Sequence, residues 1–270
     1  MKQADRSDTH RSAIQCEDIR PRPDIQQQIS GICRGVGRDD DRGIRRFPYR
    51  SNRNRPRFLT KGGLIYCFMD WRDVDEIREA FRRLSLEQIN LAVWVKPNGG
   101  MGSLYRSRHE LIFVAKRKGE AHRNNVELGK QGRYRTNVWE FAGASGGAKS
   151  EEDDFSVHPT VKPVKLLQEV MLDVTAAGEF VLDPFLGSGS TLLAAERVKR
   201  VCLGLEISPA YVDVTIARWE KMTGKEAIHA GTGLTFREVQ EHRNVESSDL
   251  IGPPEPDNRS PVSIDDPEDF

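Results

Sequence analysis

The fold class is decided by the sequence VLDPFLGSGST, residues 181–191. An apolar strand at residues 180–182 runs into a glycine turn, and a helix is expected to begin at Ser190. Glycine has no side chain, so the backbone of such a turn can approach a ligand closely. This order of strand, glycine turn and helix predicts a binding site for a nucleotide-type cofactor.

A carboxylate follows at the end of the next apolar strand, residues 201–205. This residue, Glu206, is placed to accept hydrogen bonds from both hydroxyls of a ribose. A dinucleotide is not indicated, because the motif G-x-G-x-x-G would need a glycine where Leu192 stands. A phosphate-binding loop is not indicated either, because it requires a lysine after Gly189 and none follows. The pattern favours a cofactor with an adenosine and no phosphates. The alternative is that the glycines only form a tight turn.

Two flanking segments add to the pattern. Upstream lies HPTVKP, residues 158–163, followed by apolar residues at helical spacing. Downstream lies GLEISPAYVDVTIAR, residues 204–218, which contains another expected helix. The three motifs are H-P-T-x-K-P, D-P-F-x-G-S-G-[ST]-T and G-x-E-x-[ST]-x-x-Y followed seven residues later by arginine.

This combination resembles the amino-group DNA methyltransferases, which methylate adenine N6 or cytosine N4 with S-adenosylmethionine. The resemblance covers residues 62–225 and is closest to the class whose catalytic motif precedes the cofactor motifs. It implies an α/β, Rossmann-like methyltransferase fold with a mostly parallel sheet and helices on both faces, and a role in DNA modification such as restriction-modification. The residues that it assigns to the cofactor are Asp183, Phe185, Gly187 and Gly189 in the turn, Glu206 at the ribose, and His158, Thr160, Lys162 and Pro163 in the upstream motif. His158 could equally cap or pack within a loop.

The catalytic motif of that family, D-P-P-[YFW] or S-P-P-[YFW], occurs nowhere in the 270 residues. Its first two residues accept the hydrogens of the exocyclic amine, and its aromatic residue stacks on a base that has been extruded from the duplex. The nearest string, FPY at residues 47–49, lacks the acid and the second proline. The catalytic residues are therefore unassigned.

Three functions remain open on the sequence. The first is a DNA methyltransferase acting on an exocyclic amine of a flipped base, with adenine N6 favoured over cytosine N4. The second is a catalytically dead remnant that still binds S-adenosylmethionine. The third and weakest is a methyltransferase-like module for a small molecule or another polymer.

The chain divides into three segments by composition. Residues 1–61 are rich in arginine and lack apolar periodicity, so we expect a disordered or aberrant segment. In this segment the catalytic part of the domain is expected to be lost or replaced, for example by a frameshift. The alternative is an arginine-rich arm that binds phosphate. Residues 62–225 form the predicted methyltransferase domain, incomplete at its N-terminal side, with a target-recognition insertion at 119–150. Residues 226–270 are expected to be a polar, acidic and largely disordered tail.

Within the domain, apolar runs predict strands at residues 64–69, 89–95 and 111–115. Asp73 and Glu76 form a capping-box pattern before an amphipathic helix. Strands alternating with helices predict that residues 62–118 and 157–225 share one sheet.

The formal net charge is zero, but basic residues concentrate between Lys96 and Arg135. With the family resemblance, this concentration predicts contact with the phosphates of double-stranded DNA. Tyr105 and Trp139 are interpreted as packing residues. The four cysteines are scattered and form no C-x-x-C pair, so no metal site is expected. No apolar run reaches eighteen residues, so we expect a cytoplasmic protein with no membrane contact. A homodimer is left open.

Overall fold

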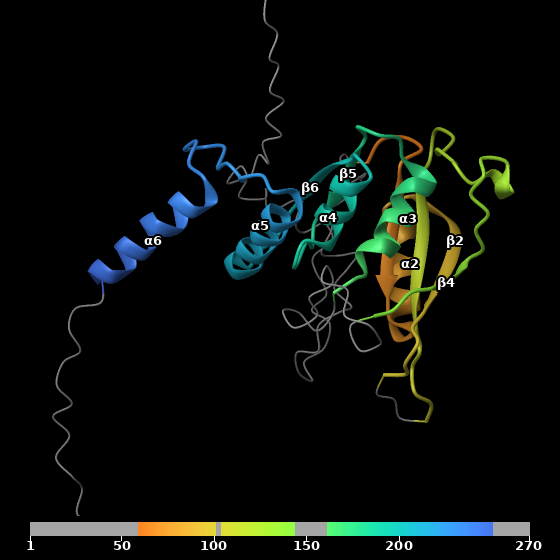
Figure 1. Cartoon of the computed structure of the whole chain (residues 1–270). Coiled ribbons are helices and arrows are strands. Elements are labelled where there is room, and N and C mark those ends of the chain that lie inside the picture. The colour runs from red at the N-terminus through yellow and green to blue at the C-terminus, as the bar shows by residue number, and fades with distance from the viewer. Residues whose placement is uncertain (1–58, 101–103, 144–160, 251–270) are drawn as a thin grey trace, which may run out of the picture. The chain divides into compact units, whose positions relative to one another are not determined.

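The computed structural model describes residues 59–100, 104–143 and 161–250, with the backbone alone for 244–250. The described residues fall into two compact units, one within residues 59–225 and one of residues 226–250. Figure 1 labels their helices and strands. The expectation of a disordered or aberrant segment at residues 1–61, with the catalytic part lost or replaced, concerns residues that lie almost entirely outside the described ones, and it stays a prediction.

The larger unit contains a four-stranded sheet in the order β1-β3-β2-β4. Its strands are β1 (Leu64–Met69), β2 (Leu86–Val95), β3 (His109–Arg117) and β4 (Val138–Glu140). Strand β3 is antiparallel to both β1 and β2, while β4 is parallel to β2. The sheet is thus mixed, where the sequence predicted a mostly parallel one. The reason is that β2 and β3 pair as the two strands of a hairpin, and the described residues between them, 96–100 and 104–108, form no crossover helix.

Helices cover both faces of this sheet, as predicted (Figure 1). Helix α2 (Val74–Arg83) contributes Ile77 and Phe81 to a core cluster with Met69 and Phe113. Helix α3 (Val164–Val174) covers the opposite face, where Leu166 and other α3 residues pack in a second cluster. The buried members of that second cluster are Ala92, Trp94, Ile112, Trp139, Leu166 and Val170.

The start of α2 differs from the predicted capping box. Asp73 is the N-cap residue, but its side chain makes no capping hydrogen bond. A short 3-10 helix, η1 (Trp71–Asp73), precedes α2, and Asp70 caps it by accepting a hydrogen bond from Arg72 N at 3.0 Å. The chain therefore begins to coil one turn earlier, and the capping role moves to Asp70.

The cofactor motifs form a β-α-β unit within the larger of the two compact units. Strands β5 (Phe180–Asp183) and β6 (Val201–Gly204) are parallel, and α4 (Ser190–Arg197) connects them. Helix α5 (Pro209–Thr223) follows. The prediction of a single sheet is not met among the described strands: β1 pairs with β3, β5 pairs with β6, and no described strand bridges the two pairs.

The smaller unit differs from the predicted disordered tail between residues 226 and 250. An isolated bridge joins Ile228 to Thr235, and helix α6 (Phe236–Leu250) follows. Thr235 and Glu238 form a capping box: Glu238 accepts from Thr235 N at 2.7 Å, and Thr235 Oγ1 accepts from Glu238 N at 3.3 Å. This local motif gives the helix a defined start. No helix in the described part of the chain has both the length and the apolar character needed to cross a membrane.

Candidate cofactor-binding site

Asp183, the last residue of β5, organises the glycine turn. Its Oδ1 accepts a hydrogen bond from Phe185 N at 3.0 Å, and its Oδ2 accepts one from the Thr191 hydroxyl at 2.5 Å. The carboxylate therefore ties the turn to the first turn of α4. Burial raises the pKa of Asp183 above its usual value, and the nearby negative charge of Glu206 raises the pKa further, against the lowering effect of the two hydrogen bonds.

This raised pKa predicts a pH-dependent effect of Asp183→Asn. The raised pKa means that the folded protein holds this proton more tightly than the unfolded chain does. Its contribution to stability is fully present below the pKa of the unfolded state and is lost as the pH rises through the pKa of the folded state. The asparagine variant carries no charge, so its Tm relative to the parent should rise between pH 4 and pH 8. Thermal unfolding of both proteins across that range is the measurement. A Tm difference that does not change with pH would contradict the burial of this charge.

The two glycines of the turn have different roles. Both have positive φ, +54° at Gly187 and +85° at Gly189, a region that favours glycine. A Cβ atom on Gly189 would lie 2.7 Å from Thr215 Cγ2, so this glycine permits close packing on α5. Among the described residues, a Cβ atom on Gly187 would meet only Phe185 O, at 3.9 Å. Gly187 thus presents its backbone to open space, as a ligand cradle requires.

Glu206 lies against this cradle. Its Oε2 accepts a hydrogen bond from Gly187 N and its Oε1 accepts one from Ser208 N, both at 2.8 Å. Because each carboxylate oxygen has two lone pairs, both oxygens keep a further acceptor position. The side chain can therefore hold the turn and still accept hydrogen bonds from a pair of ligand hydroxyls.

Glu206→Gln should weaken binding of S-adenosylmethionine by about 1–3 kcal/mol. Glutamine keeps the shape but has one acceptor oxygen, so its amide NH₂ must face either the Gly187 or the Ser208 N–H donor. Isothermal titration calorimetry measures the change, with Glu87→Gln on β2 as the control for loss of a carboxylate elsewhere. Unchanged affinity in Glu206→Gln would remove this residue from the site.

Two residues of α5 that were not predicted as site residues, Thr215 and Arg218, support the turn. Thr215 Oγ1 on α5 donates a hydrogen bond to Gly187 O at 2.9 Å. Arg218, the last residue of the downstream motif, donates to the backbone oxygen of Ser188 and to its hydroxyl. The spacing of that motif could have pointed to Arg218, whereas Thr215 sits in an ordinary helical pattern that gives no such signal. Phe185 within the turn and Ile207, next to Glu206, both leave apolar surface exposed.

The upstream motif is only partly described. His158 and Thr160 lie outside the described residues, and Pro163 is the N-cap residue of α3. Lys162 Nζ lies 2.5 Å from Glu110 Oε1, and Lys96 Nζ lies 3.2 Å from Glu110 Oε2. These partners are on the first sheet, so the described contacts of Lys162 do not join it to the glycine turn. Its assignment to the cofactor stays a prediction.

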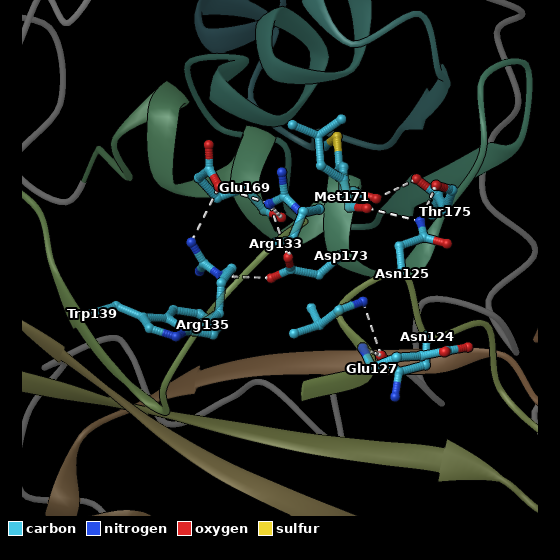
Figure 2. A network of polar contacts seen from close by, with 12 residues as sticks. Asn124, Asn125, Glu127, Arg133, Arg135, Trp139, Glu169, Met171, Asp173 and Thr175 are labelled. Carbon is cyan, nitrogen blue, oxygen red and sulfur yellow. Dashed lines mark hydrogen bonds and ion pairs between the residues drawn. The ribbon is translucent and has the colours of Figure 1, made fainter. Parts of the chain in front are cut away.

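A second polar network fixes part of the predicted recognition insertion to α3 (Figure 2). Arg133 pairs with Glu169 at 2.7 Å and with Asp173 at 2.9 Å, and Arg135 pairs with the same two carboxylates at 3.2 and 2.9 Å. The Arg135 guanidinium also lies 5.0 Å from the centre of the Trp139 ring. Trp139 is buried, which confirms its interpretation as a packing residue. The network therefore serves to position residues 133–139 against α3.

Residues 38–217 match a family model of the N6 and N4 methyltransferases, described as DNA methylase. The match covers more than half of the chain and begins upstream of Gly62. The protein thus belongs to this family of S-adenosylmethionine-dependent DNA amino-methyltransferases, which confirms the predicted family and its cofactor at the level of the family.

Two curated relatives are type II methyltransferases. M.ScaI of Streptomyces caespitosus is 35% identical over 89 residues, which are 33% of this chain and 29% of that protein. M2.DpnII of Streptococcus pneumoniae is 26% identical over 170 residues, which are 60% of this chain and 62% of that protein. The chain therefore matches less than two thirds of the length of either relative.

Solved structures show the fold. The cytosine-N4-specific PvuII DNA methyltransferase is similar with a TM-score of 0.50 and 16% identity, covering 60% of this chain and 65% of that one. A complex of M1.HpyAVI with S-adenosylmethionine has a TM-score of 0.49 and 24% identity, covering 59% and 76%. The likeness to the PvuII enzyme confirms the α/β methyltransferase fold class.

Proposed function

We propose that this chain binds S-adenosylmethionine at the turn of residues 183–189 together with Glu206. The observation that carries the proposal is the Glu206 carboxylate hydrogen-bonded to Gly187, whose Cβ side is open. Gly187 would let the cofactor approach the backbone, and Glu206 would accept hydrogen bonds from the ribose hydroxyls. The exposed side chains of Phe185 and Ile207 offer apolar surface for an adenine ring.

The charges of the turn suit this cofactor. Residues 183–191 and 204–208 contain two carboxylates and no lysine or arginine. Glu206 at this turn repels phosphate and attracts positive charge, so the site favours a cofactor with a cationic sulfur and an amino group over a dinucleotide, while the guanidinium of Arg218 is hydrogen-bonded to Ser188. When bound, S-adenosylmethionine supplies an electrophilic methyl group on its positively charged sulfur.

We also propose that the acceptor is an exocyclic amine in double-stranded DNA, with adenine N6 favoured over cytosine N4, and that the chain acts in the cytoplasm. Support comes from membership in the DNA methylase family and from relatives that are type II methyltransferases. A modification role beside a restriction enzyme fits those relatives. The target base must leave the duplex to reach a cofactor held at a protein turn, as in other enzymes that act on bases.

A second candidate is a protein that binds S-adenosylmethionine without transferring its methyl group. The absence of D-P-P-[YFW] and S-P-P-[YFW] from the sequence favours it, because an amine acceptor needs groups that take up its hydrogens and stabilise developing charge. This candidate shares the cofactor site with the first. The two differ only in the transfer step.

The deciding experiment measures transfer of a labelled methyl group from S-adenosylmethionine to unmethylated duplex DNA, with cofactor binding measured on the same preparation. Incorporation supports the transferase, and digestion to nucleosides identifies the methylated base. Binding without incorporation supports the second candidate. A preparation that is folded but binds no S-adenosylmethionine overturns the cofactor site itself.

A further inference from the structure

The hairpin between β2 and β3 extends beyond the paired strands. We define residues 96–100 and 104–108 as the hairpin tip; residues 101–103 lie outside the described residues and are not part of it. Lys96 N donates a hydrogen bond to Arg108 O at 2.8 Å, and Gly100 N donates one to Ser107 O at 2.7 Å. The backbone on both sides of the tip is therefore held in place.

The tip presents two large apolar side chains to solvent. Leu104 is 81% exposed and Tyr105 is 83% exposed. The interpretation of Tyr105 as a packing residue is therefore wrong. Single exposed apolar residues are common on protein surfaces, but two adjacent ones at the end of a hairpin are a surface suited to contact.

Fixed cations flank these side chains. Arg106 Nη2 donates to Gly99 O at 2.6 Å and its Nε donates to Gly100 O at 3.4 Å, while Arg108 Nε donates to Lys96 O at 2.9 Å. These hydrogen bonds orient both guanidinium groups and engage only some of their five N–H donors. Backbone carbonyls do not neutralise the positive charge, so the guanidinium groups remain available to anions.

The tip also lacks acidic residues. Residues 97–109 contain no aspartate or glutamate. The next residue along the chain, Glu110, is already shared by Lys96 and Lys162. The local charge is therefore positive around an exposed aromatic ring, a combination found where proteins bind nucleic acid by base stacking and phosphate contact.

We propose that the hairpin tip is a DNA-contact element in which Tyr105 stacks on an unstacked base and Arg106 and Arg108 contact phosphates. This inference rests on the proposed function and adds a specific surface to it. The Lys162–Glu110 ion pair places the base of the tip beside the end of the H-P-T-x-K-P segment, which the family resemblance assigns to the cofactor pocket. Tyrosine and arginine also occur at protein interfaces, but a tip with several cations and no acidic residue has the charge that a phosphate backbone attracts, which favours DNA.

The test measures binding of a fluorescein-labelled, unmethylated DNA duplex by anisotropy for the full chain and its variants. Tyr105→Ala should weaken binding about 5- to 150-fold, the range for removing one aromatic stacking partner. Tyr105→Phe keeps the ring and should bind as the parent does. Arg106→Ala should lower the slope of log K against log salt by about one, whereas Arg78→Ala, an exposed arginine on α2, should leave both affinity and slope unchanged.

Binding of S-adenosylmethionine by each variant separates this inference from the proposed function. It should be the same in all of them, since Tyr105 is exposed and outside the glycine turn. If the parent binds DNA and Tyr105→Ala binds it equally well, the inference is overturned and the proposed function stands. If Tyr105→Phe fails as Tyr105→Ala does, stacking is overturned. If the parent binds no DNA, both the inference and the proposed DNA substrate fall.

Discussion

Gly187→Val should lower the affinity for S-adenosylmethionine at least about 100-fold while the protein remains folded. In the part of the chain that the structure describes, the nearest neighbour of a Cβ atom on Gly187 would be Phe185 O, at 3.9 Å. A branched side chain built there would fill the volume that the cofactor needs, and a loss of about 2.7 kcal/mol corresponds to 100-fold in affinity. Isothermal titration calorimetry measures the affinity, and thermal unfolding checks the fold.

The matched control is Gly178→Val, in the turn before β5. Gly178 has a φ of +80° and no neighbour within 4 Å of its Cβ position, so valine there meets the same backbone strain in open space. Each variant should lose about 1–2 kcal/mol of stability from the left-handed conformation. Only Gly187→Val should lose the cofactor. If both variants bind S-adenosylmethionine like the parent, the cofactor does not approach this turn.

The cofactor half of the fold was predictable because its determinants are local. An apolar run, a glycine turn and a capped helix lie within residues 180–197, and β5 and α4 begin at the predicted residues, Phe180 and Ser190. The contacts that complete the site are not local. Thr215 reaches Gly187 across 28 residues of sequence, and no residue pattern in α5 reports which side chain will face the turn.

The first sheet shows a different limit. Apolar runs located β1, β2 and β3, but the direction of β3 depends on the length and content of its connection to β2. Strand β2 begins at Leu86, three residues before the predicted start, because Glu87 and Gln88 pair with β3 despite their polarity. The three-residue strand β4 is too short to leave a periodic pattern. Pairing with a neighbour, not local preference, determines these elements.

Aromatic residues show why burial could not be assigned from residue type. Trp139 and Tyr105 carry similar apolar surface, yet Trp139 packs under Arg135 while Tyr105 faces solvent. Both lie in polar, glycine-containing sequence without a usable period. The difference arises because β4 joins the sheet, whereas the hairpin tip extends beyond it. Tertiary placement therefore separates a core aromatic from one that is free for a ligand.

Trp94→Ala should destabilise the protein by about 3–5 kcal/mol, the usual range for truncating a buried large aromatic residue. Trp94 is 2% exposed, its ring meets Phe68 edge to face at a centroid distance of 6.5 Å, and its Nε1 donates to Phe141 O at 2.9 Å. The variant therefore leaves a cavity between the sheet and α3, and an unpaired carbonyl. Chemical denaturation measures the change in the free energy of unfolding.

The same substitution also tests whether Trp94 anchors α3 to the sheet. The Lys96 and Lys162 ammonium groups lie 4.5 and 5.7 Å from the centre of the Trp94 ring, so its loss removes their shared support. Trp71→Ala is the control, because Trp71 is 55% exposed and its removal should change stability by less than about 1 kcal/mol. Equal losses for the two tryptophans would mean that Trp94 does not anchor α3 to the sheet. A large loss for Trp94 alone would show that this residue anchors α3 to the sheet.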